Sequence, residues 1–164
     1  GSNTQYGGEN ASASVLEVTP NPNRQFDKDK TLLLYTEDKW GKGKDWYAKD
    51  GHEVDLPIII LMNQNSASAS ELFAGTMQDY DRAWVFGTVS YGKGIVQTIR
   101  SFPDGSAVEF TTHYYFTPAR RNIHKVGITP DYKVEIPEAD REAYLQDRTK
   151  DVQLKKAVET LSGF

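Results

Sequence analysis

The feature that most constrains the fold is a continuous apolar run at residues 56–62 (LPIIILM). Its isoleucines and its length predict a strand that is buried on both faces of a sheet. Polar residues 63–65 (NQN) interrupt the run, and small serine and alanine residues then open a helix expected over 66–79. Glu71 lies in the first turns, where the helix dipole favours a carboxylate. A strand that leads directly into a helix is typical of layered α/β domains.

Further strands are expected on both sides of this unit. They are predicted at residues 31–36, 45–49, 83–86, 95–99, 107–116 and 132–136, with a short strand or a helical turn at 15–18. Glycine-containing turns at 40–44 and 104–105 join two pairs of these strands into hairpins. Residues 152–161 predict an amphipathic helix. The succession of elements therefore predicts an α/β fold.

Composition excludes several classes of site. The 164 residues are enough for one domain with a core of its own, and the net charge of −4 provides no basic field for nucleic acid. The sequence contains no cysteine, which excludes disulfides, thiol nucleophiles and thiolate zinc sites. Its three histidines, His52, His113 and His124, lack the spacing of a metal site. No metal and no cofactor are expected.

Three serines lie where the predicted strand meets the predicted helix: Ser66, Ser68 and Ser70. The first N–H groups of a helix have no partner within the helix. A serine that attacked a carbonyl there would have an oxyanion donor close by, such as the N–H of Ala69. The other interpretation is that these serines only cap the helix and pack closely. The Gly-x-Ser-x-Gly sequence of a nucleophile elbow is absent.

A nucleophilic serine needs a base, and Lys93 is the candidate. Gly92 and Gly94 flank it and allow the backbone to approach closely, leaving the amine in a narrow slot. Gln97 follows four residues later, on the same face of a strand, where its amide could orient the amine. An exposed turn with a solvated lysine is the other interpretation. None of the three histidines has a supporting motif for the role of base.

Several short segments follow one another in an order that is specific as a set. They are 65–71 (NSASASE), 77–79 (MQD), 85–87 (VFG), 91–97 (YGKGIVQ), 104–107 (DGSA), 114–118 (YYFTP), 127–131 (GITPD) and 153–157 (QLKKA). Together they closely resemble the carboxy-terminal processing peptidases, also called tail-specific proteases. The resemblance extends over roughly residues 30–161.

The resemblance implies a serine endopeptidase that cleaves proteins near their C-terminus through a Ser–Lys dyad and an acyl-enzyme. It makes Ser68 the nucleophile and Lys93 the base, with Gln97 positioning the lysine. It implies an oxyanion hole formed by the N–H groups of Ala69 and Gly7, the latter in a Tyr-Gly-Gly segment like the end of the family's oxyanion strand. The implied fold is a mixed sheet flanked by helices, akin to the crotonase and Clp protease cores.

The resemblance also sets expectations for organisation and partners. Residues 1–29 are expected to be a tag scar, beginning Gly1-Ser2, and a partial N-terminal segment. Residues 30–164 would be the protease catalytic core, a truncated catalytic domain without a PDZ domain. The expected partners are proteins or peptides with accessible C-terminal tails, not nucleic acid, in an extracytoplasmic location. Two alternatives stay open: a catalytically incompetent binding or scaffold module of the same fold, and a crotonase-like acyl-transfer enzyme.

Overall fold

The structure, a computed structural model, describes residues 14–17, 31–48, 56–137, 140, 142 and 147–163. Gly7, His52 and the expected domain boundary at residue 30 lie outside the described residues. Within these ranges the elements are, in order, β1 (Ser14–Glu17), β2 (Leu32–Asp38), β3 (Gly43–Tyr47), β4 (Ile58–Met62), α1 (Ala69–Asp79), β5 (Ala83–Gly87), β6 (Ile95–Ser101), β7 (Ala107–Phe116), β8 (Tyr132–Lys133), the 3-10 helix η2 (Arg148–Lys150) and α3 (Val152–Leu161).

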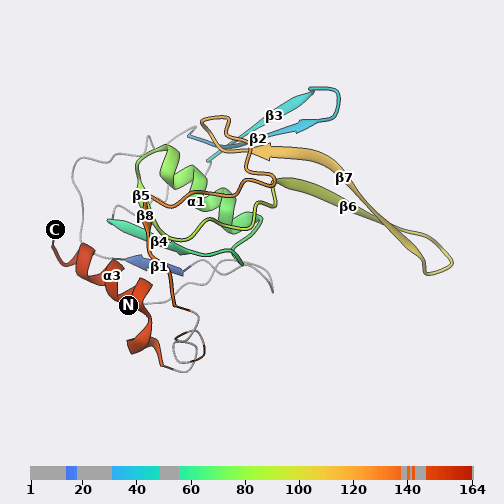
Figure 1. The fold of residues 1–164 in the computed structure, drawn as a ribbon. Coiled ribbons are helices and arrows are strands. Elements are labelled where there is room, and N and C mark those ends of the chain that lie inside the picture. Colours follow the sequence, from blue (N-terminus) through green and yellow to red (C-terminus); the bar gives the residue numbers. More distant parts are fainter. Residues whose placement is uncertain are drawn as a thin grey trace.

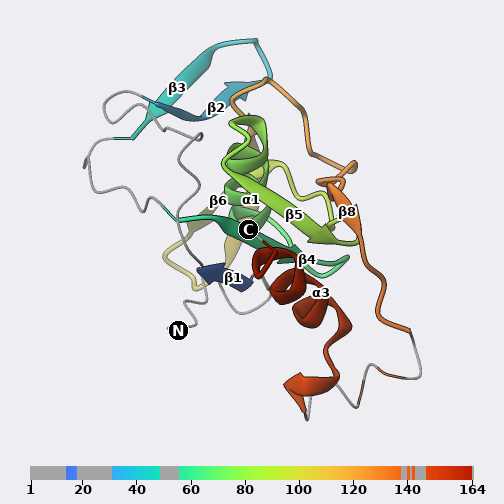
Figure 2. The same ribbon diagram turned by 90° about the vertical axis from the view of Figure 1, so that its left-hand side faces the viewer.

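The first sheet has the strand order β1-β4-β5-β8, with β4, β5 and β8 parallel and β1 antiparallel to β4. Helix α1 covers one face of this sheet and α3 the other (Figures 1 and 2). On β4, Ile58 and Ile60 pack on the side of α1, whereas Ile59 packs on the side of α3. The prediction of a strand buried on both faces is therefore confirmed, because the alternating side chains of β4 enter two separate apolar clusters.

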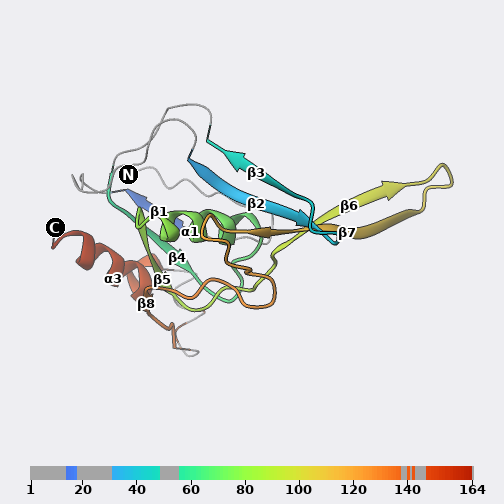
Figure 3. The ribbon, with the colours of Figure 1, turned by 90° about the horizontal axis from the view of Figure 1, so that it is seen from above.

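The second sheet has the order β3-β2-β7-β6 and is antiparallel throughout. Both predicted hairpins are confirmed: β2 with β3, and β6 with β7, the latter closed at Gly105, whose φ is +86°. The outer part of the β6–β7 hairpin extends away from the rest of the molecule as an arm (Figure 3). The base of the arm lies beside the glycine turn that precedes β6, since the N–H of Tyr115 donates to the carbonyl of Gly94 at 3.1 Å.

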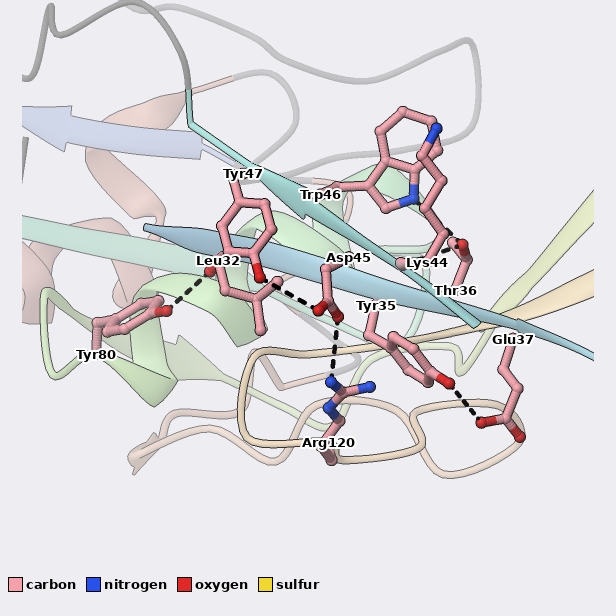
Figure 4. A network of polar contacts seen from close by, with 10 residues as sticks. All are labelled: Leu32, Tyr35, Thr36, Glu37, Lys44, Asp45, Trp46, Tyr47, Tyr80 and Arg120. Atoms are coloured by element: carbon pink, nitrogen blue, oxygen red, sulfur yellow. Dashed lines mark hydrogen bonds and ion pairs between the residues drawn. The ribbon is translucent and has the colours of Figure 1, made fainter. Parts of the chain in front are cut away.

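A polar and aromatic network joins the β2–β3 hairpin to the loop after β7 (Figure 4). Arg120 donates to Asp45 Oδ1 at 3.1 Å, and its guanidinium lies 3.6 Å from the ring centre of Tyr35. The indole N–H of Trp46 donates to Thr36 on the neighbouring strand at 3.2 Å. Arg120 and Trp46 therefore make contacts within this network that hold the hairpin in place.

Several boundaries differ from the prediction: β3 spans Gly43–Tyr47 rather than 45–49, and β2 and β6 each end two residues later than expected. Helix α1 begins at Ala69 rather than at residue 66, because Ser66 closes the turn after β4, where its Oγ accepts from the N–H of Asn63 at 3.2 Å, and Ser68 has a positive φ of 57°. Strand β8 ends at Lys133 rather than at 136. The overall class is the expected mixed α/β fold with helices flanking a sheet. No helix in the described ranges is long and apolar enough to cross a membrane.

Candidate functional site

Ser68 is the residue at which the segment after β4 ends and helix α1 begins. It is the N-cap of the helix, with φ 57° and ψ −119°. A residue with a Cβ strains its backbone at such angles, at a cost of about 1–3 kcal/mol, and such strain concentrates at functional sites. Helix α1 stabilises this strained conformation, because the Ser68 carbonyl accepts from the N–H groups of Glu71 and Leu72, each at 3.0 Å. The Ser68 side chain lies half-buried at the positive end of the helix dipole.

Glu71 occupies the centre of the site. Its side chain is fully buried and accepts hydrogen bonds at both carboxylate oxygens. Oε1 accepts from Ser90 Oγ at 2.5 Å and from the N–H of Gly92 at 2.6 Å, and Oε2 accepts from the N–H groups of Ser68 at 2.9 Å and Lys93 at 2.8 Å. One carboxylate oxygen therefore joins the main chains of Ser68 and Lys93. These donors satisfy a buried carboxylate that would otherwise be costly to bury.

The turn that carries Lys93 can be built only with glycine at Gly92. Its φ is +88°, and a Cβ there would lie 2.9 Å from the backbone nitrogen of Val126. Lys93 itself is half-buried, and its carbonyl accepts a short hydrogen bond from the phenol of Tyr115. In the part of the chain that the structure describes, no hydrogen bond joins the Lys93 amine to the Ser68 hydroxyl. The hydrogen bonds that connect these two residues run through Glu71.

Tyr115 is a buried residue that contacts the turn of Lys93. It is 6% exposed and packs in the cluster between the first sheet and α1. Burial raises the pKa of its phenol to about 12, the nearby Ser68 hydroxyl works against this rise in pKa, and the Glu71 charge adds to it. The phenol is therefore protonated at any physiological pH and can donate one hydrogen bond.

The other predicted site residues are less closely connected. Ala69 is the exposed first residue of α1, and none of the hydrogen bonds among the described residues uses its N–H. Gln97 lies exposed in β6, and no described hydrogen bond links it to Lys93. His113 lies in β7, and the ring of His124 packs edge-on against Tyr114 at 5.5 Å. Within the described ranges no three acidic or histidine side chains form a possible metal site.

The sequence reasoning missed the roles of Glu71, Ser90 and Tyr115. Glu71 was expected only to complement the helix dipole. The sequence from Ser68 to Glu71 also matches the Ser-x-x-Glu pattern of a capping box, which would have linked Glu71 to the N–H of Ser68. Ser90 and Tyr115 carry no comparable local signal, because their partners lie far away in the sequence.

Comparison with known proteins decides the family. The sequence profile of peptidase family S41 matches residues 17–134, which is more than half of the chain. The chain belongs to peptidase family S41. A carboxyl-terminal-processing protease of Synechocystis is 35% identical over 133 residues, which are 81% of this chain and 31% of that relative. A probable CtpA-like serine protease of Staphylococcus saprophyticus is 53% identical over 83 residues, which are 51% of this chain and 17% of that relative.

Solved structures of this S41 protein's relatives agree with the sequence comparison. The photosystem II D1 C-terminal processing protease superposes with a TM-score of 0.60 at 36% identity, over 68% of this chain and 29% of that chain. A putative S41 protease from Bacteroides fragilis has a TM-score of 0.62 over 90% of this chain and 39% of that chain; at 16% identity it shows the fold alone. The chain spans about a third or less of the length of the two curated relatives named above.

Proposed function

We propose that the chain carries the nucleophile and the base of a serine endopeptidase that cleaves proteins near their C-terminus. Membership of family S41 implies a serine peptidase with protein substrates, and the relatives include proteins named carboxyl-terminal-processing proteases. One observation carries the assignment of residues. The N–H groups of Ser68 and Lys93 donate to the same oxygen of a buried carboxylate, next to a strained helix start.

In the proposed reaction Ser68 Oγ attacks the carbonyl carbon of the scissile peptide, and its proton passes to the uncharged Lys93 amine. The negative charge that develops on the carbonyl oxygen lies near the N–H of Ala69, at the positive end of α1. Collapse of this intermediate breaks the C–N bond, and Lys93 gives its proton to the leaving amine. Water then enters and hydrolyses the acyl-enzyme by the reverse sequence of proton transfers.

The two remaining site residues complete the proposal. Gln97 would orient the Lys93 amine, and Gly7 would supply a second N–H to the oxyanion. Both roles rest on the resemblance of their segments to the family motifs. The S41 match favours a peptidase over a crotonase-like acyl-transfer enzyme. An incompetent binding module of the same fold is an outcome of the following test.

The test is labelling of the chain with a fluorophosphonate, together with its cleavage of peptides. Ser68→Ala is expected to abolish both, and Lys93→Ala to abolish cleavage. Ser66→Ala is the matched control and is expected to retain both, because Ser66 is fully buried and its oxygen serves the turn before α1. Equal loss in Ser66→Ala, or full cleavage by Lys93→Ala, would refute the assignment.

The pH dependence gives an independent readout of the base. Because Lys93 must be an uncharged amine to accept the proton, cleavage should keep rising with pH above neutrality. A profile that levels off at the titration of a histidine would instead point to His113 or His124. Cleavage of acyl-CoA but not of peptides would support the acyl-transfer alternative.

A further inference from the structure

We propose that Ser90 is a positioning residue. Its buried hydroxyl ties the Glu71 carboxylate to a segment of the core, and through Glu71 it fixes the main chains of Ser68 and Lys93. The inference rests on the proposed roles of Ser68 and Lys93 as nucleophile and base. It goes beyond them because it assigns a function to a hydroxyl that neither attacks the substrate nor accepts the proton.

Residues 123–128, in the loop between β7 and β8, provide the fixed reference. Ile123 and Ile128 are each 1% exposed and belong to the cluster between the first sheet and α1. Gly127 has a φ of +76°, and a Cβ there would lie 2.4 Å from the carbonyl oxygen of Ser90. Only glycine lets the segment approach Ser90 this closely. Anchored in the packed core at both ends, the segment has little room to move.

The turn that carries Lys93 is attached to this segment. The N–H of Ser90 donates to the carbonyl of Ile128 at 3.2 Å, and the N–H of Ile128 donates to Ser90 Oγ at 2.7 Å. Two residues after Ser90, the carbonyl of Gly92 accepts from the N–H of Lys125 at 2.8 Å. The Ser90 side chain therefore takes part in the attachment together with the main chain.

The hydrogen-bonding capacity of the hydroxyl sets the direction of its contact with Glu71. A backbone N–H only donates, so Ser90 Oγ is the acceptor in its contact with Ile128. A carboxylate only accepts, so the single proton of the hydroxyl points to Glu71 Oε1, at 2.5 Å. Both partners are used at once, and the hydroxyl is fixed in one rotation between the core segment and the carboxylate.

This link fixes a torsion that helix α1 leaves free. The terminal torsion of a glutamate side chain is broad, so the orientation of a carboxylate depends on its hydrogen bonds. The main-chain donors to Glu71 belong to Ser68, Gly92 and Lys93, the segments that the carboxylate itself holds together. Ser90 Oγ is the described donor that is itself hydrogen-bonded to the core segment. It therefore relates the orientation of the carboxylate to the packed core.

The experiment compares Ser90→Ala with the matched control Ser66→Ala. Ser66 is also a buried serine whose Oγ accepts from a main-chain N–H, that of Asn63. The probe is a fluorophosphonate, and the measured quantities are the maximal labelling rate, the half-saturating probe concentration and the final labelled fraction. We expect the maximal rate of Ser90→Ala to fall about tenfold, because a carboxylate that rotates displaces the nucleophile and the base. The other two quantities, and all three in Ser66→Ala, should stay unchanged.

A merely structural role for Ser90 predicts a different pattern. Partial unfolding would lower the final labelled fraction and leave the rate of the folded fraction unchanged. That pattern, or a maximal rate of Ser90→Ala close to that of the parent chain, would overturn the inference.

A double variant tests whether Ser90 acts through Glu71. If it does, the maximal rate of Ser90→Ala with Glu71→Gln should stay within about twofold of that of Glu71→Gln alone, because the hydroxyl no longer has a carboxylate to orient. If the two residues act separately, the two fold-changes multiply in the double variant. Multiplied effects would overturn the inference.

Amide hydrogen exchange needs no activity and separates this inference from the proposed function. The amides of Gly92 and Lys93 donate to Glu71 and should exchange faster in Ser90→Ala, relative to the amides of β4, but not in Ser66→Ala. Unchanged exchange in Ser90→Ala would overturn the inference even if Ser68 is the nucleophile. Faster exchange, in a protein whose parent chain does not label at Ser68, would support the link through Ser90 and contradict the proposed function.

Discussion

Replacement of Glu71 by glutamine tests the centre of the site most directly. The glutamine amide has one acceptor oxygen in place of two, so its NH2 group must face one pair of the present donors. The less damaging orientation puts the NH2 at the position of Oε1, because the Ser90 hydroxyl can turn to accept from it. The N–H of Gly92 then has no acceptor, whereas the N–H groups of Ser68 and Lys93 keep a neutral one.

The magnitude of the Glu71→Gln effect follows from these contacts. One buried N–H without a partner costs about 1–3 kcal/mol, and two hydrogen bonds that lose their charge weaken by about 1 kcal/mol each. Relief of carboxylate desolvation offsets part of this loss, so we expect the free energy of unfolding to fall by about 2–4 kcal/mol. The proposed chemistry should suffer more, because a misplacement of about 1 Å can cost about 10²-fold in rate.

The assay for Glu71→Gln combines urea unfolding, followed by tryptophan fluorescence, with the rate of fluorophosphonate labelling in the folded protein. Glu109→Gln is the control, since Glu109 is an exposed carboxylate on the β6–β7 arm. It should change neither quantity, as expected for an exposed side chain. A Glu71→Gln variant that unfolds within about 0.5 kcal/mol of the parent chain and labels at the same rate would show that the carboxylate does not hold the site together.

Two further changes probe the same region. Gly92→Ala should lower the free energy of unfolding by more than Gly105→Ala: both impose a positive φ, costing about 1–2 kcal/mol, but only the first puts a Cβ 2.9 Å from the Val126 nitrogen. Equal losses in urea unfolding would contradict the steric argument. The phenol of Tyr115 should make stability pH-dependent, because its pKa is about 12 in the folded state and about 10 in an unfolded chain. The stability that the protonated phenol contributes is complete below pH 10 and is lost as pH rises toward 12. Between pH 10 and 12 the free energy of unfolding of the parent chain should therefore fall faster than that of Tyr115→Phe. Parallel plots of this free energy against pH would contradict the prediction.

Local sequence patterns predicted the elements well where each element depends on its own residues. The helix expected over 152–161 is α3 (Val152–Leu161), because its apolar spacing and the Asp151 cap act within one segment. The start of α1 was wrong by three residues. Small serines and alanines do not distinguish a turn from a first helical turn, and the hydrogen bonds of Asn63 and Glu71 decide it.

The sequence by itself determined the two-sided burial of β4, the two hairpins and the order of motifs that marks the S41 family, since each depends on residues that are close together in the sequence. Only the tertiary structure decided that Glu71 meets Ser90, Gly92 and Lys93, which lie 19–22 positions along the chain. It also decided that Tyr115 reaches the lysine turn. The physical reason is that periodicity specifies which face of an element is buried, whereas the partner of a buried polar group depends on how separate elements pack together.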